Sequence, residues 1–104
     1  MTLLNTTFHV HKSIDALFIK WVKEIYLPVA MDSGLFKNPL FTRIMTEVDP
    51  EATSYAVQLQ AVSHSEADEW HNTAAAKLKE ALSREVGERF LHFTTYMEII
   101  KVEN

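Results

Sequence analysis

The stretch LLNTTFHVH, residues 3–11, alternates apolar and polar side chains along its whole length. The positions on its more apolar side are Leu4, Thr6, Phe8 and Val10. Because successive side chains of a strand point to opposite faces, this alternation predicts a β-strand with one face toward a core. The other face then carries two histidines, His9 and His11, and their purpose is the first question that the sequence raises.

Helical periodicity follows this strand and returns later in the chain. Residues 13–33 repeat apolar side chains every three or four positions after Ser13, a residue that favours the N-cap. Pro28 lacks the backbone N–H that a helix interior needs, so it predicts a kink or a break. A second helix is predicted from a capping box that opens at Ser63 up to Gly87, a residue type that favours helix ends.

Three further segments have the pattern of strands, at residues 40–48, 54–62 and 89–100. The turn sequence DPEAT joins the first two of these into a hairpin. The order β-α-β-β-α-β predicts a ferredoxin-like α+β fold, with one antiparallel sheet in the strand order 4-1-3-2 and both helices on one face. The 104 residues suffice for a single domain of this kind, residues 1–104.

The composition limits the classes of function. The net charge is −4 and no two Lys or Arg residues are adjacent, which argues against a nucleic-acid-binding protein. The absence of cysteine excludes disulfides and thiolate metal sites. Because the chain starts without a basic, apolar leader and has no apolar stretch near the ~20 residues of a membrane span, we expect a cytoplasmic protein that does not enter membranes.

With both helices on one face, the opposite face of the predicted sheet has no cover. The side chains expected there are Asn5, Thr7, His9, His11, Phe41, Arg43, Met45, Glu47, Ala56, Gln58, Gln60, Phe90, His92, Thr94, Tyr96 and Glu98. The large apolar members of this set are Phe41, Met45, Phe90 and Tyr96. An exposed group of this size usually marks an interface or a ligand groove. A second copy packed face to face would cover it and enclose a partly polar cavity, so the sequence predicts a homodimer.

Several stretches of the chain are similar to a known family. They are NTTFHV (5–10), WVKEIYLPVAMDSGLF (21–36), the strand pair around Arg43 with SYAVQL (54–59), KL (77–78), VGERF (86–90) and the closing strand. Together they resemble a small bacterial family, known only as a domain of unknown function, within the dimeric α/β-barrel superfamily. The resemblance implies the ferredoxin-like fold and dimerisation. It implies no activity, because the wider superfamily includes cofactor-free monooxygenases, haem-degrading enzymes and simple ligand binders.

Histidines on the uncovered face form the first candidate site. His9 and His11 lie near the end of the first strand, and the last strand begins beside them with His92. Three imidazoles at one rim of a cavity could hold zinc, copper, nickel or iron. No HxxxH or HExxH spacing supports a metal site, and polar surface or interface residues are the simpler explanation. We therefore expect no metal and no cofactor, with these three histidines as the candidates should a metal be bound.

A second candidate site is a set of polar side chains on the same predicted face. Its members are Asn5, Arg43, Gln58, His92, Tyr96 and Glu98. Arg43 could hold a carboxylate or an enolate while Tyr96 or a histidine moves a proton. The structural alternative is that Arg43 forms an ion pair with Glu98 or Glu47 inside an interface.

Three functions stay open at this point. The first is a homodimer that binds a small molecule in or beside the cavity between its subunits, or that has a purely structural role. The alternative is a cofactor-independent monooxygenase or isomerase that uses Arg43, Tyr96 and the histidines of the rim. The third is a metal or haem binder centred on His9 and His92.

Other conspicuous residues have plainer explanations. Trp21 and Trp70 fall on the apolar stripes of the two helices and are expected in the core. His64 and His71 are spaced by seven on the second helix, where solvated side chains are the usual reading.

Overall fold

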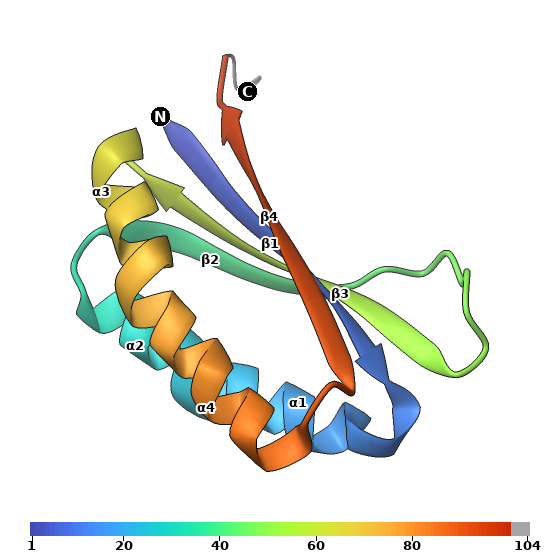
Figure 1. The fold of residues 1–104 in the computed structure, drawn as a ribbon. Coiled ribbons are helices and arrows are strands. Elements are labelled where there is room, and N and C mark those ends of the chain that lie inside the picture. The colour runs from blue at the N-terminus through green and yellow to red at the C-terminus, as the bar shows by residue number, and fades with distance from the viewer. Residues whose placement is uncertain (101–104) are drawn as a thin grey trace.

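The computed structural model describes residues 1–100, and its elements follow the predicted order (Figure 1). The strands are β1 (Thr2–His11), β2 (Phe36–Arg43), β3 (Ala52–Ala61) and β4 (Phe90–Glu98). Between β1 and β2 lie η1 (Lys12–Ile14), α1 (Asp15–Trp21), η2 (Val22–Tyr26) and α2 (Leu27–Asp32). Between β3 and β4 lie α3 (His64–Trp70), η3 (His71–Ala75) and α4 (Ala76–Val86).

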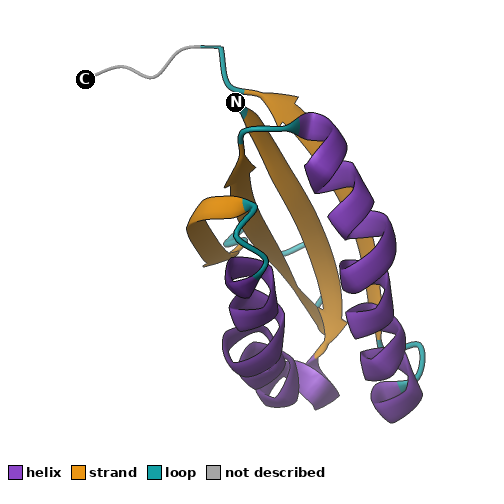
Figure 2. Ribbon diagram, turned by 90° about the vertical axis from the view of Figure 1, so that its left-hand side faces the viewer, coloured by secondary structure: helices purple, strands orange, loops and turns teal. Residues whose placement is uncertain are grey.

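The four strands form one antiparallel sheet in the order β2-β3-β1-β4, which is the predicted order read from the other edge. Strand β1 lies in the centre, with Asn5 opposite Gln58 of β3 and Leu4 opposite Tyr96 of β4. Both helical segments lie on one side of the sheet, and Figure 2 looks onto that side. The fold is therefore a ferredoxin-like sandwich of two layers whose second sheet face has no covering layer (Figure 1).

Aromatic rings from the sheet and both helical segments fill the core. Phe8 in β1 lies at the centre, with its ring centroid 5.0 Å from that of Phe18 and 5.9 Å from that of Tyr26. Tyr26 in turn meets the ring of Trp70 on the second helical segment at 5.8 Å. Trp21 is also buried, so the prediction that both tryptophans belong to the core is confirmed. These edge-to-face and tilted contacts join the two helical segments to the central strand.

Both helical segments contain a π-helical turn. In the first, the N–H of Leu27 donates to the carbonyl of Val22, five residues earlier, directly before Pro28. A proline has no N–H for the carbonyl four residues before it and crowds that carbonyl, so the wider turn accommodates it without a break. The structure has no break at Pro28, because α2 continues the helix, and the irregularity of the backbone there is this π-helical turn. Within residues 1–100, no helix is long and apolar enough to cross a lipid bilayer.

The second strand differs from its prediction in position and in facing. It covers residues 36–43, whereas residues 44–48 belong to the connection to β3. The register shifts between Lys37 and Leu40, where Pro39 lies and Asn38 has a φ of 52°. A proline is tolerated here because β2 is an edge strand, and the irregularity exchanges the two faces of the residues after it.

The last strand also has its faces exchanged relative to the prediction. Phe90 is buried, and Thr94 bonds the hydroxyl of buried Thr6, so the even-numbered positions of β4 face the helices. Leu91 and Phe93 lie on the uncovered face instead. Both faces of this segment are apolar, so the alternation alone could not decide between them. The predicted apolar group of Phe41, Met45, Phe90 and Tyr96 is therefore wrong, because Phe41, Phe90 and Tyr96 pack on the helix side and Met45 lies in the exposed connection.

Candidate functional site

The six residues of the second predicted site do not come together on one face. They separate into four places along and across the sheet, so their joint placement in one cavity is wrong. Asn5 and Gln58 are neighbours on the uncovered face. The other four residues occupy strand positions that face the helices: Arg43, His92, Tyr96 and Glu98.

On the uncovered face, Asn5 has an unusual hydrogen-bonding state. Its amide N–H donates weakly to the hydroxyl of Thr7 at 3.4 Å, while its Oδ1 is buried and has no partner among the described residues. An unsatisfied buried acceptor is uncommon and costs free energy. This acceptor is already buried within the single subunit, so it is not itself part of the open surface.

Arg43 lies at the far end of the sheet from Tyr96. Its guanidinium donates to the hydroxyl of Tyr55 at 3.5 Å and lies over that ring, and the Tyr55 hydroxyl donates to Asp15. This contact raises the pKa of Arg43, whereas burial raises the pKa of Tyr55. By strand register, Arg43 and Tyr96 are roughly 20 Å apart, four residues along the sheet and three strands across it. They cannot act on one small substrate within a subunit, and the predicted pairs of Arg43 with Glu98 or Glu47 are replaced by Tyr55.

The three histidines of the first predicted site are also separated. His9 lies on the uncovered face, where its ring contacts Ser54 at 3.0 Å and Asp49 at 3.4 Å. His11 accepts from the backbone N–H of Ser13 and caps η1. His92 is on the opposite face of the sheet, beside Phe8 and Phe90. The predicted gathering is wrong because the register of β4 turns His92 toward the helices.

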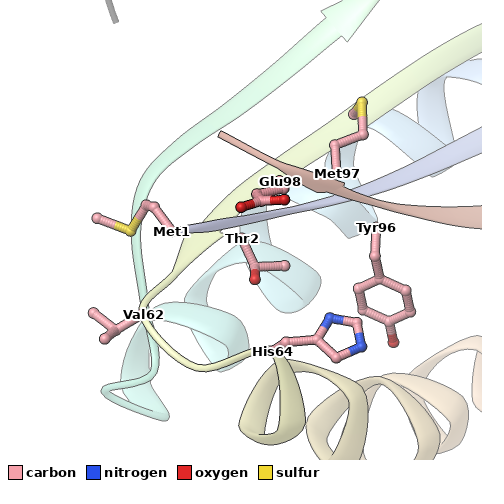
Figure 3. A pocket seen from close by; sticks show the side chains of 7 residues that line it. All are labelled: Met1, Thr2, Val62, His64, Tyr96, Met97 and Glu98. Carbon is pink, nitrogen blue, oxygen red and sulfur yellow. The ribbon is translucent and has the colours of Figure 1, made fainter. Parts of the chain in front are cut away.

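A cavity of about 460 Å³ lies at the end of the sheet beside the first turn of α3 (Figure 3). Its lining residues are Met1, Thr2, Val62, His64, Tyr96, Met97 and Glu98. Two of the six predicted site residues, Tyr96 and Glu98, therefore line it together. The rings of His64 and Tyr96 lie side by side in its wall in an edge-to-face contact, with centroids 4.7 Å apart (Figure 3). Ser63 holds His64 in place by capping α3 through the backbone N–H of Glu66, as the predicted capping box requires.

Tyr96 connects this cavity to a polar cluster under the helices. Its hydroxyl donates to Asp68 Oδ1 at 2.8 Å, and burial together with this bond raises the pKa of Tyr96. The ring of His71 stands edge-on to the Tyr96 ring at 6.2 Å. A neutral phenol beside a carboxylate and two imidazoles can relay or donate a proton to a bound molecule.

The cluster continues from His71 to a buried lysine. Lys79 is 4% exposed, and its Nζ lies 3.5 Å from His71 Nδ1. Burial lowers the pKa of Lys79 to about 8. Burial, and then the charge of Lys79, lowers the pKa values of His71 and His92. We call His71, Lys79 and His92 the Lys79 cluster.

Sequence reasoning missed four members of this region, and for one a signal existed. The missed residues are His64, Asp68, His71 and Lys79. Lys79 falls in register with buried Ala75, Leu82 and Val86 on the inner stripe of the helix. A lysine in an apolar stripe is rare unless its charge is paired or used. His64 and His71 are not simply solvated, because their spacing of seven places both rings against Tyr96.

A comparison with known structures finds the same fold in proteins of low sequence identity. HapK from Hahella chejuensis matches with a TM-score of 0.73 and 15% identity, over 100% of this chain and 97% of that one. A dimeric ferredoxin-like protein from an uncultured marine organism matches with a TM-score of 0.63 and 14% identity, over 98% of both chains. A candidate antibiotic-biosynthesis monooxygenase from Bacillus cereus matches with a TM-score of 0.56 and 11% identity, over 98% of this chain and 97% of that one. At these identities the likeness shows the fold alone.

The sequence comparisons give the family. No curated protein matches the chain significantly. A family model described as "Domain of unknown function (DUF4286)" matches residues 1–100, which confirms the resemblance seen in the sequence. The chain therefore belongs to the DUF4286 family.

Proposed function

We propose that the protein is a homodimer, joined through the uncovered sheet face, that binds a small molecule in the cavity beside α3. The observation that carries this proposal is the group of large apolar side chains on a face without a covering layer. Its members are Leu40, Leu91, Phe93 and Met97. Leu91 and Phe93 are 66% and 63% exposed in the single chain, and in the strand register they lie opposite His9 and Thr7 of β1.

This face fits a second copy of itself better than it fits water. Apolar patches on such a scale usually mark contact surfaces, and a two-fold axis pairs each patch with its own copy. Gln58 and Thr7 lie among the apolar side chains and offer hydrogen-bonding groups that a partner subunit could use. The ferredoxin-like protein of the same fold from an uncultured marine organism is dimeric, which supports this arrangement.

The cavity lies where a ligand site would border this interface. Met97 belongs to the uncovered face, whereas Tyr96, the residue before it, faces the helices, and both line the cavity. Apolar walls with a few convergent polar groups are typical of small-molecule sites. Here the polar groups are the Tyr96 hydroxyl, the His64 ring and the Glu98 carboxylate.

The interface is tested by a charge placed in its centre. We expect Phe93→Asp to convert the dimer into a folded monomer, because the carboxylate would be buried between the subunits but is solvated in one subunit. Ile25→Asp is the matched control, since Ile25 is 45% exposed on the helical side. The measurement is the mass by light scattering after gel filtration. A monomeric wild-type protein at micromolar concentration, or a dimeric Phe93→Asp variant, contradicts the proposal.

The ligand site is tested with a panel of metabolites in a thermal-shift screen. We expect the compounds that stabilise the wild-type protein to lose their effect on His64→Ala and on Tyr96→Phe. Arg43→Ala is the control, because Arg43 lies at the other end of the sheet and should leave the shifts unchanged. Stabilising compounds whose effect depends on Arg43 and not on Tyr96 would place the site elsewhere.

A further inference from the structure

We propose that the Lys79 cluster binds the carboxylate of a small organic anion. The inference goes beyond the proposed function, because none of the three residues of this cluster lines the cavity beside α3. The observation behind it is a buried cation that lies beside two imidazoles and has no counter-ion among residues 1–100. It concerns His71, Lys79 and His92, which come from η3, α4 and β4.

The position of Lys79 makes a purely structural role costly. It occupies the inner stripe of α4 between Ala75 and Leu82, where an apolar side chain would pack without penalty. Taking an ammonium group out of water is unfavourable unless a charge or several hydrogen bonds compensate for it. The one side-chain hydrogen-bond contact described for Lys79 is His71 Nδ1, at 3.5 Å.

The charges around Lys79 do not balance within the described chain. Among residues 1–100, the ion pairs are His9–Asp49, Lys20–Glu24 and Arg84–Glu80, and none includes Lys79. The Asp68 carboxylate accepts the Tyr96 hydroxyl, and its charge has the smallest of the effects on the pKa of His71. The positive charge of Lys79 in turn acts on both imidazoles.

An external carboxylate would supply what is missing. It would pair with the ammonium group of Lys79, and the imidazoles of His71 and His92 could each donate an N–H to it. His92 is solvent-exposed on the edge strand and His71 is partly exposed, so the two imidazoles can be reached from solvent, whereas Lys79 is buried. The aromatic rings of Phe90, stacked on His92, and of Tyr96, beside His71, favour an anion with an apolar body.

The test uses benzoate as the probe and benzamide, its uncharged isostere, as the matched ligand. We expect benzoate to raise the midpoint of thermal unfolding of the wild-type protein at neutral pH and benzamide to leave it unchanged. Lys79→Met should abolish the benzoate response while raising the midpoint of the unliganded protein, because an isosteric apolar side chain removes the desolvation cost. A lysine with only a structural role would give the opposite, a lower midpoint in the variant.

Two further measurements make the outcome decisive. In histidine-detected NMR titrations, saturating benzoate should raise the pKa values of His71 and His92, since a negative charge favours their protonated forms. Arg43→Ala removes a cation at the other end of the sheet and should keep the benzoate response. The proposal is overturned if benzoate at high millimolar concentration has no effect, if benzamide acts equally, if inorganic phosphate replaces benzoate as the bound anion, or if Lys79→Met responds as the wild type does.

These results separate the two proposals. A benzoate response that depends on Lys79 and persists in monomeric Phe93→Asp supports the anion site even if the dimer fails. Stabilising metabolites that are all neutral or cationic, with effects that depend on Tyr96, support the cavity and overturn the anion site.

Discussion

Lys79 shows how one residue can set the pH dependence of stability. Its pKa is about 8 in the folded protein, below the ordinary 10.5. Between these values the unfolded chain binds the proton more strongly, so the free energy of unfolding should rise with pH. This stabilisation is fully present above pH 10.5, the pKa of Lys79 in the unfolded chain. It is lost as the pH falls through about 8, the pKa in the folded protein.

We therefore expect the free energy of unfolding to rise between pH 8 and about 9.5, by at most ~1.4 kcal/mol per pH unit. Lys79→Met should remove this rise, and urea unfolding at each pH measures both proteins. The pH range of this test ends below pH 10 because of Tyr26, whose pKa burial raises from 10.0 to about 12. Above pH 10 the folded protein therefore holds the Tyr26 proton more strongly than the unfolded chain does, which lowers the free energy of unfolding as the pH rises. A parallel pH profile in the two proteins would contradict a buried, titrating Lys79.

At the scale of elements, the first turn of α3 brings His64 to the cavity, and its cap stabilises that turn. The Ser63 hydroxyl accepts the backbone N–H of Glu66 at 3.1 Å. Ser63→Ala should therefore lower the free energy of unfolding by about 1 kcal/mol in urea titrations. The same change at exposed Ser83, inside α4, should be neutral or slightly stabilising, because alanine is the better helix former.

The end of α4 depends on a backbone conformation that only glycine adopts easily. Gly87 has φ 68° and ψ −140°, and the space where a Cβ would stand is empty. Gly87→Ala should therefore cost about 1–3 kcal/mol through backbone strain and not through a clash. Glu88→Ala is the neighbouring control and should change the free energy of unfolding by less than about 0.5 kcal/mol. Equal effects of the two changes would contradict a strained turn at Gly87.

At the scale of the whole molecule, the open sheet face should link stability to concentration. If two subunits cover this face for each other, dilution favours the unfolded chain by mass action. The midpoint of thermal unfolding of the wild-type protein should then rise with protein concentration. That of Phe93→Asp should be independent of concentration, and calorimetry over a hundredfold concentration range compares them. A concentration-independent midpoint in the wild-type protein would indicate that the face stays open.

Prediction from sequence succeeded where a pattern was one-sided. Strand β1 has four inward positions that alternate with polar ones, and all four are buried as predicted. The N-cap at Ser63 and the glycine end of α4 are equally local, and both are confirmed. The prediction from sequence failed in β4, where Phe90 and Leu91 are both large and apolar. The pattern there does not show which of the two faces of the strand is buried.

The candidate site was also predicted only in part from the sequence. Tyr96 and Glu98 were chosen for their chemistry and do line one cavity, but on the helix side of the sheet. Lys79 and His71 were missed although their spacing of eight places them near one stripe of the helix and Lys79 falls among its buried positions. Their contact at 3.5 Å and the burial of Lys79 are seen only in the folded structure.

The sequence by itself determined the order of the elements, the sheet topology, the inner face of β1 and the family. The elements and the inner face of β1 depend on local alternation, caps and breakers, which act over a few residues. The topology follows from the order of the elements, and the family from the similarity of longer stretches of sequence. Only the tertiary structure decided which faces of β2 and β4 turn outward, and so where His92, Tyr96 and Arg43 lie. The physical reason is that a shift of one residue in strand register reverses every side chain after it, and that shift is set by an edge proline, a bulge and the packing of the partner strand.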